Sequence, residues 1–442
     1  MPTNVKVFIG ILAMAIVFSA CDTSLNVKSP EASYFLKYFG QEGSQTGIDM
    51  VENSDGTMVL FGTARTGDND PQFFLVKSDK LGNFVWQQTF GKGICQAVDV
   101  ELTSSGDIVI VGNIIPPGRT DHDVFVQKYD QNGDSIGSSQ TYRYTKVTGG
   151  EADDIAHSIS ETNDGFIVAG GSDNIATSSP IATNYAFFMR LDQNLGQYSQ
   201  GTWPIVPANG QGQKNVAVKI VQLAAGGFYV FGYTNYDYIN GTGSADFNFW
   251  YFKLENDGSP DSVSYLGTSG SDERLFSVAA DVSPAGTGFF LGGLQNSLAG
   301  NRLFITRLKQ PPLAFIASDA LLIPPTSFPQ DLGSFSAILN PPYPSDEWIS
   351  VCAASDGFLA LTNETTAVNN NLWLVKFTGL GNLVWGPVIY GGPGDDFAGS
   401  VKVLSDGKIA IIGTMTVGQP SGVNSETKMV LIKVNKDGQF QQ

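Results

Sequence analysis

Cysteine is scarce in this chain. The three cysteines are Cys21, Cys95 and Cys352. So few cysteines exclude a disulfide-rich scaffold. Cys95 and Cys352 fall in the first strands of the second and sixth copies of a sequence repeat, and these copies are not neighbours. We therefore expect Cys95 and Cys352 to be free, buried thiols.

Histidine and catalytic motifs are also scarce. His122 and His157 are the only histidines, and the sequence has no HExxH, no CxxC pair and no glycine-rich phosphate loop. No motif therefore supports a metalloprotease, a zinc ribbon or a nucleotide-binding enzyme, and nothing supports a Ser-His-Asp arrangement.

Positive charge is the third deficit. Lys and Arg together number 25 against 42 Asp and Glu, which gives a formal net charge of −17. A surface that binds nucleic acid needs clustered Lys and Arg to contact phosphates, so we expect no nucleic-acid partner. The acidity suits solubility or association with cations.

Long apolar runs are missing after the first 20 residues. Val7–Phe18 follows Lys6 and is too short for a membrane-spanning helix, but it fits the apolar region of a signal peptide. The run ends in Phe18-Ser19-Ala20-Cys21, which resembles the lipobox of bacterial lipoproteins, with Phe18 in place of the usual leucine. The resemblance implies that residues 1–20 are a cleaved signal peptide and that Cys21 carries the lipid, followed by a short tether over 21–30. An ordinary secretory signal with an incidental cysteine is the alternative.

Against these absences stands a segment of about 60 residues that recurs seven times. Each copy has a tight-turn glycine followed by a short apolar run, as in Ser54-Asp55-Gly56 followed by TMVLFGT. The seven marker glycines are Gly56, Gly106, Gly165, Gly227, Gly288, Gly357 and Gly407. A strand-rich repeat of this period predicts a β-propeller.

Each repeat contains four short runs rich in β-branched and aromatic residues, which we denote strands a to d. Residues 31–442 are therefore expected to form one all-β domain, a seven-bladed propeller of four-stranded antiparallel blades. The last repeat ends before a full strand d, and Ser33–Gly40 resembles the missing strand. The N-terminal strand should thus close the last blade and remove an open edge, which favours a monomer.

Strand c has the most regular pattern. A basic residue recurs in all seven copies, and three residues earlier stands a large apolar residue in six of them, as in Phe74 and Lys77. The odd spacing places the two on opposite sheet faces. We expect the apolar residues to pack between blades and the bases to pair with neighbouring blades, with a row of cations as a ligand site as the alternative.

Loop lengths vary on one face of the predicted propeller. Because strands alternate in direction, b–c and d–a connections share a face, and the long b–c loops are 172–184, 234–245 and 415–426. A rigid scaffold that varies on one face is typical of a binding surface. A proline-rich insertion of about 310–345 separates the fifth and sixth repeats, and its strands cannot be assigned from the sequence.

Acidic pairs gather where strand a begins, on this variable face. They are Asp153-Asp154, Asp272-Glu273, Asp346-Glu347 and Asp395-Asp396. Strand a lines the central channel, so these carboxylates should surround its opening. They could face a ligand or hold Ca²⁺, which takes six to eight oxygen ligands. The alternative is structural, with each Asp capping its own turn.

Two functions remain open. Tyr236 and Tyr238 lie in the b–c loop YTNYDYINGTG, whose composition suits a glycan or protein contact, although packing within the loop would also explain them. We favour a non-catalytic module of the cell envelope that binds or assembles with glycan or protein ligands. The alternative is a glycan-active hydrolase or lyase, since two carboxylates at a suitable separation are enough for glycoside hydrolysis.

The N-terminus and the repeats together resemble surface lipoproteins of Gram-negative bacteria, of the kind found in Bacteroidota, built on a β-propeller repeat. The resemblance covers nearly the whole chain. It implies a lipid-anchored protein of the cell envelope, at the outer membrane. Because the tether is short, we expect the short-turn face to lie near the membrane and the variable face to be directed outward. It transfers no catalytic residue.

Overall fold

The computed structural model describes residues 33–441, apart from a set of internal gaps. These gaps are 68, 145–151, 174–183, 204–213, 223–226, 238–241, 255–263, 267–270, 281, 283–287, 298–299, 310–348, 366–367, 380 and 419–425. Within the described ranges, no helix has the length and apolarity needed to cross a membrane.

The strands form seven antiparallel sheets, one for each repeat. Blade 1 contains β2 (Ser44–Glu52), β3 (Met58–Arg65), β4 (Gln72–Ser78) and β5 (Phe84–Phe90). Blade 2 contains β6 (Ile94–Leu102), β7 (Ile108–Ile115), β8 (Asp123–Tyr129) and β9 (Ser135–Tyr142). Blade 3 contains β10 (Asp154–Thr162), β11 (Gly165–Asp173), β12 (Asn184–Asp192) and β13 (Gln197–Trp203). Blade 4 contains β14 (Asn215–Gln222), β15 (Phe228–Asp237), β16 (Thr242–Leu254) and β17 (Ser264–Leu266).

The remaining blades complete the ring. In the described residues, blade 5 contains β18 (Asp272–Ala280), β19 (Gly288–Ser297) and β20 (Gly300–Lys309). Blade 6 contains β21 (Ile349–Ala354), β22 (Gly357–Thr365), β23 (Asn370–Thr378) and β24 (Leu383–Tyr390). Blade 7 contains β25 (Phe397–Val403), β26 (Ile409–Val417), β27 (Glu426–Val434) and β1 (Phe35–Phe39). The seven-bladed propeller is confirmed; the insertion 310–345 lies outside the described residues.

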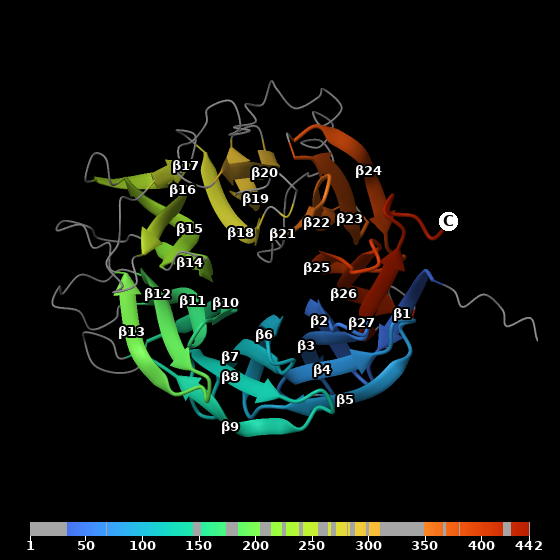
Figure 1. Cartoon of the computed structure of the whole chain (residues 1–442), viewed down its shortest axis with the longest axis horizontal. Helices are drawn as coiled ribbons and strands as arrows, with labels where there is room; N and C mark the ends of the chain where they lie inside the picture. The colour runs from blue at the N-terminus through green and yellow to red at the C-terminus, as the bar shows by residue number, and fades with distance from the viewer. Residues whose placement is uncertain are drawn as a thin grey trace, which may run out of the picture. The chain divides into compact units, whose positions relative to one another are not determined.

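The N-terminal strand closes the propeller. β1 pairs antiparallel with β27, from Phe35 opposite Lys433 to Phe39 opposite Met429. Figure 1 shows the blue β1 beside the red β27, and the first strand of each blade nearest the central opening. The predicted closure is confirmed, because strands from both ends of the chain pair within the last blade.

A glycine in strand b accompanies a β-bulge in strand a. In six inner strands the register shifts by an extra residue, as between Gly47 and Asp49 in β2. The bulge brings the Thr46 carbonyl against Gly62, where a Cβ would lie 1.8 Å from that oxygen. Blade 6 has Thr362 instead of glycine, and its pairing of β21 with β22 shows no shift. The glycines of the FGT-like motif therefore make room for the bulge.

The hydrophobic core is divided among the interfaces between blades. In the described residues there are seven clusters, and each joins two consecutive blades. The large strand c residues Phe74, Phe125, Phe187, Trp250 and Trp373 are all buried and each packs toward the preceding blade. This confirms their predicted role; the side chain of Phe304 lies outside the described residues.

The strand c bases stabilise turns rather than forming a ligand site. The ammonium of Lys77 donates to the Gln131 carbonyl of the next blade at 2.9 Å, and Lys128, Arg307 and Lys433 make the same kind of contact. Arg190 and Lys376 pair with Asp164 and Asp356 in the a–b turns of their own blades, and Arg190 also lies over the Phe228 ring of blade 4. Pairing with neighbouring blades is thus confirmed for the first four of these bases.

The other repetitive features also serve the scaffold. In the c–d turns, Oδ1 of Asp79 accepts the backbone N–H groups of Leu81 and Asn83, both at 2.8 Å. The equivalent turns at Asp130, Asp192 and Asn435 repeat this arrangement. Cys95 and Cys352 are free thiols, and burial raises the pKa of both, which makes them poor nucleophiles.

Candidate ligand-binding site

Three of the four predicted acidic pairs lie at the start of inner strands, around one end of the channel, which we call the channel mouth. In each, the first acid is partly or fully exposed and the second is buried, as expected for neighbours in a strand. Oδ1 of the first acid accepts a backbone N–H from strand c of the preceding blade or from the residue just before that strand. The pairs are Asp153 with His122 at 2.9 Å, Asp272 with Phe247 at 3.0 Å and Asp395 with Asn370 at 3.0 Å.

The second acids belong to the scaffold. Asp154 accepts the Tyr144 N–H at 2.6 Å and the Ser172 hydroxyl. Asp396 accepts the N–H groups of Gly392 and Thr416 at 2.6 and 2.8 Å. Burial raises the pKa of Asp154 to about 7 and raises that of Asp396 as well. Glu273 is buried beside Gln295, which donates to its Oε1 at 2.7 Å.

Other predicted site residues are placed only in part. Asp346, Glu347, Tyr238 and Cys21 lie outside the described residues. The backbone of Tyr236 pairs with Gly243 on the β15–β16 hairpin, and its side chain is not described. In the described ranges, no group of three or more His, Cys, Asp or Glu side chains could hold a metal ion.

A ring of polar residues surrounds the channel at the level of the bulges. One residue comes from each inner strand: Asp49, Asp99, Ser158, Lys219, Ser277, Ser350 and Ser400. Several accept a backbone N–H from the next inner strand: Asp49 from Val100, Asp99 from Ile159, Ser277 from Val351 and Ser350 from Val401. The ring thus satisfies donors on strand edges that have no further strand to pair with.

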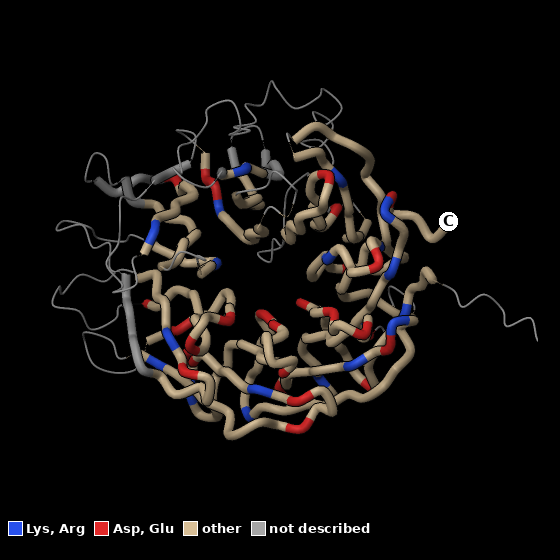
Figure 2. Tube along the Cα trace, in the orientation of Figure 1, with Lys and Arg blue, Asp and Glu red and all other residues tan. Residues whose placement is uncertain are grey.

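Opposite charges meet in this ring. Lys402 lies 3.4 Å from Asp49, and Lys219 lies 3.2 Å from Asp99, across blade 3. Figure 2 shows basic and acidic residues on the inner strands. Asp49 and Asp99 also share a hydrogen bond. Burial raises the pKa of Asp99 to about 7, with a further rise from Asp49, whereas the pKa of Asp49 is held below its usual value, against burial, by Lys402. Of the two carboxyls, Asp99 is therefore the one that holds a proton as the pH approaches neutrality.

This ring was not among the predicted site residues, although the sequence carries a signal for it. Five of its members stand seven residues before their marker glycine: Asp49, Asp99, Ser158, Ser350 and Ser400. A polar residue at a fixed place in an inner strand indicates a side chain that faces water or a neighbouring strand. Lys219 and Ser277 do not have this spacing of seven residues, because their a–b turns are longer.

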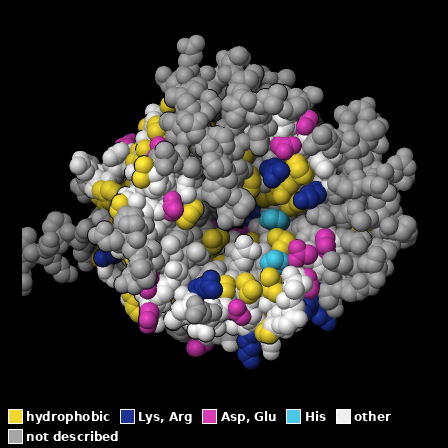
Figure 3. Space-filling model, turned by 180° about the vertical axis from the view of Figure 1, so that it is seen from behind, with side chains coloured by type: hydrophobic (Ala, Val, Ile, Leu, Met, Phe, Trp, Pro, Cys, Tyr) yellow, Lys and Arg dark blue, Asp and Glu magenta, His cyan; other side chains and the backbone are white. Residues whose placement is uncertain are grey.

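His122 was also missed as a partner of the acidic pairs. It ends the b–c loop of blade 2, and its Nδ1 lies 2.8 Å from Oδ1 of Asp153 in blade 3. Figure 3 shows histidine side chains near the central hollow of one face, with acidic groups close by. The other histidine, His157, occupies the bulge of β10, where burial lowers its pKa to about 4.

Comparisons with known proteins do not identify a relative from which a function could be taken. No family model matches the sequence, and no curated protein matches it. A protein of unknown function from Dyadobacter fermentans has a TM-score of 0.46 and 11% identity, covering 91% of this chain and 97% of its own. A PL25 ulvan lyase has a TM-score of 0.49 and 10% identity, covering 92% and 97%. A GH93 α-L-arabinofuranosidase of Fusarium graminearum has a TM-score of 0.42 and 10% identity, covering 91% and 97%. Similarity this low carries no argument about ligand or reaction.

Proposed function

We propose that this protein is a non-catalytic binding module of the cell envelope, held by a lipid on Cys21, that recognises glycans at the channel mouth. The observation that carries the proposal is that the two acids of each pair have different surroundings. The second acids are buried and take hydrogen bonds from the scaffold, while the first acids stay exposed with one oxygen fixed. Fixed, exposed acceptors between variable loops suit the recognition of hydroxyl groups better than proton transfer.

A panel of immobilised glycans tests this function. The full chain without its leader should bind a subset of the panel and release no product during prolonged incubation. Tyr236→Ala should weaken binding, because the β15–β16 hairpin carries this residue into a b–c loop at the variable face. A chain that binds no glycan, or that degrades one, would contradict the proposal.

The lipid anchor has a separate test. Cells that express the full chain and are fed a labelled fatty acid should place the label on the wild-type protein and not on Cys21→Ser. The variant should also leave the membrane fraction, because an acyl chain contributes about 0.8 kcal/mol for each buried methylene. Equal labelling of both proteins would overturn the assignment of Cys21, whatever the glycan panel shows.

A glycan-active enzyme remains the second candidate, and one observation favours it. Asp99 and Asp154 both have pKa values raised by burial to about 7, a value suited to a general acid near neutral pH. Under this alternative, a polysaccharide incubated with the protein would yield new reducing ends or unsaturated products, and Asp99→Asn would abolish them without unfolding the chain.

A further inference from the structure

His122 contacts Asp153 at the channel mouth through both its backbone and its side chain. Oδ1 of Asp153 accepts both the backbone N–H of His122 at 2.9 Å and its Nδ1–H at 2.8 Å. A carboxylate on Nδ1 places the ring proton there, which leaves Nε2 as a lone-pair acceptor. The two side chains are 27% and 43% exposed, so the outer atoms of both reach solvent.

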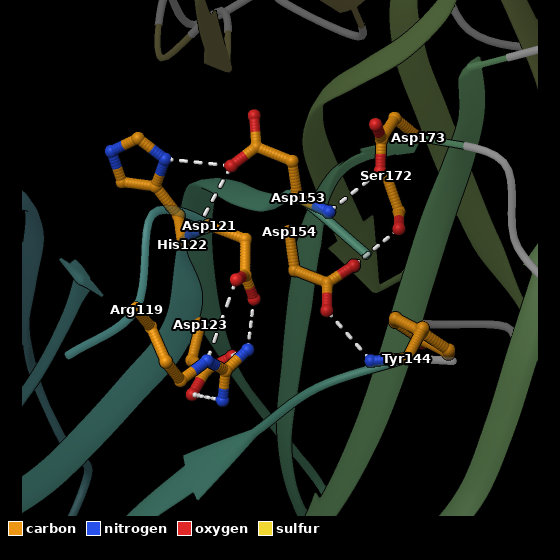
Figure 4. Close-up of polar contacts among 9 residues, drawn as sticks. All are labelled: Arg119, Asp121, His122, Asp123, Tyr144, Asp153, Asp154, Ser172 and Asp173. Carbon is orange, nitrogen blue, oxygen red and sulfur yellow. Dashed lines mark hydrogen bonds and ion pairs between the residues drawn. The ribbon is translucent and has the colours of Figure 1, made fainter. Parts of the chain in front are cut away.

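The surrounding residues hold both partners in place. Arg119 contacts Asp123 at 3.0 Å through both of its terminal nitrogens and also pairs with Asp121, and this fork braces the loop that ends in His122. On the other side, the Asp153 N–H donates to Asp173 at 2.6 Å. Figure 4 shows the outer nitrogen of the His122 ring and the second oxygen of Asp153 directed away from these supports. Such support is what a binding group needs in order to keep one geometry.

We infer that His122 Nε2 and Asp153 Oδ2 are paired acceptors for the hydroxyl groups of an uncharged sugar residue. The inference rests on the proposed function and names its contact atoms. Both atoms accept hydrogen bonds, so the ligand must supply donors, and neighbouring hydroxyls on a sugar ring supply two side by side.

Charge decides which sugars fit. Asp121, Asp123, Asp153 and Asp173 surround the pair. The nearby bases among the described residues are Arg119, which is paired with Asp121 and Asp123, and Arg143, whose charge acts on Asp123. A uronate or sulfated sugar would bring a further negative charge to a position where, among the described residues, these four acids outnumber the two bases, so like charges would repel it. The position should therefore select neutral glycans and reject acidic ones.

The test compares matched variants on neutral and acidic polysaccharides. His122→Phe and Asp153→Asn should each weaken binding of a neutral glycan about tenfold, the usual effect of losing one or two hydrogen bonds. Glu52→Gln is the control, because Glu52 joins blades 1 and 7 through the N–H and hydroxyl of Ser405 on the opposite face. It alters the same kind of inter-blade contact and should leave affinity unchanged.

A second readout observes the imidazole directly. With two histidines in the chain, selective ¹⁵N labelling gives two ring systems, which a His157→Gln sample distinguishes. His122 should show a protonated Nδ1, and a neutral glycan should shift its Nε2 signal.

The results distinguish the proposed role of His122 and Asp153 from the proposed glycan-binding function on which it rests. Neutral glycans that bind all variants equally, or binding of acidic glycans alone, would overturn the role of His122 and Asp153 while leaving a glycan-binding module in place. Failure of the wild-type chain to bind any glycan would overturn both.

Discussion

A chain that starts at Gln41 should fail to form a stable propeller. Removing β1 takes Phe35 and Phe39 out of the interface between blades 7 and 1, where both are buried with Phe74 and Leu431. Loss of each phenylalanine costs about 3–5 kcal/mol, and the whole fold is stable by only about 5–15 kcal/mol. The deletion also leaves the outer edge of β27 unpaired along five residues, which invites aggregation.

Thermal unfolding and size-exclusion chromatography would measure this effect. We expect the shortened chain to lose its cooperative transition or to elute as aggregates, and Phe35→Ala alone to lower the melting temperature. Tyr38→Ala is the matched control on the same strand, since Tyr38 is 51% exposed. If the chain from Gln41 melted like the wild type, β1 would not be the strand that closes the ring.

Asp99→Asn should remove a large part of the pH dependence of stability. Between about pH 4 and pH 7 the unfolded chain carries Asp99 as an anion, whereas in the folded protein burial keeps it protonated with a pKa of about 7. Each unit of pH over this interval therefore lowers the unfolding free energy by about 1.4 kcal/mol, and the loss levels off above pH 7. Asparagine keeps a donor for Asp49 and an acceptor for the Ile159 N–H but does not ionise.

Urea unfolding at pH 5 and pH 8 would test this expectation. The unfolding free energy of Asp99→Asn relative to wild type should rise by roughly 2–4 kcal/mol from the lower to the higher pH. His157, with its pKa lowered to about 4, acts in the opposite sense: it costs stability as pH falls below about 6.5. Its effect is common to both proteins and cancels in the comparison.

A surface variant supplies the control for this experiment. Asp134→Asn changes an exposed residue at the end of a c–d turn and should leave the pH profile unchanged. A parallel loss of stability with pH in wild type and Asp99→Asn would show that Asp99 does not hold a proton in the folded protein over this interval.

The sequence repeat made the fold predictable. It did not predict which side chains contact one another at the channel mouth. Marker glycines, alternating apolar runs and the orphan N-terminal strand specify seven blades and their closure, because these are local patterns repeated in register. Three of the four predicted acidic pairs lie at the starts of inner strands, and the fourth lies outside the described residues. The alternation that buries Asp154 and exposes Asp153 follows from strand geometry, but the partner of Asp153 does not, since His122 lies 31 residues earlier in another blade.

The sequence by itself determined the architecture of this protein: seven repeats, the strand that completes the last blade, and the face that carries the variable loops. Only the tertiary structure decided which charges meet. Lys219 reaches Asp99 from 120 residues away, and His122 meets Asp153, because ring closure brings inner strands of different blades to one axis. Local spacing encodes a strand or a turn, whereas a pair across blades depends on the position of every blade between them.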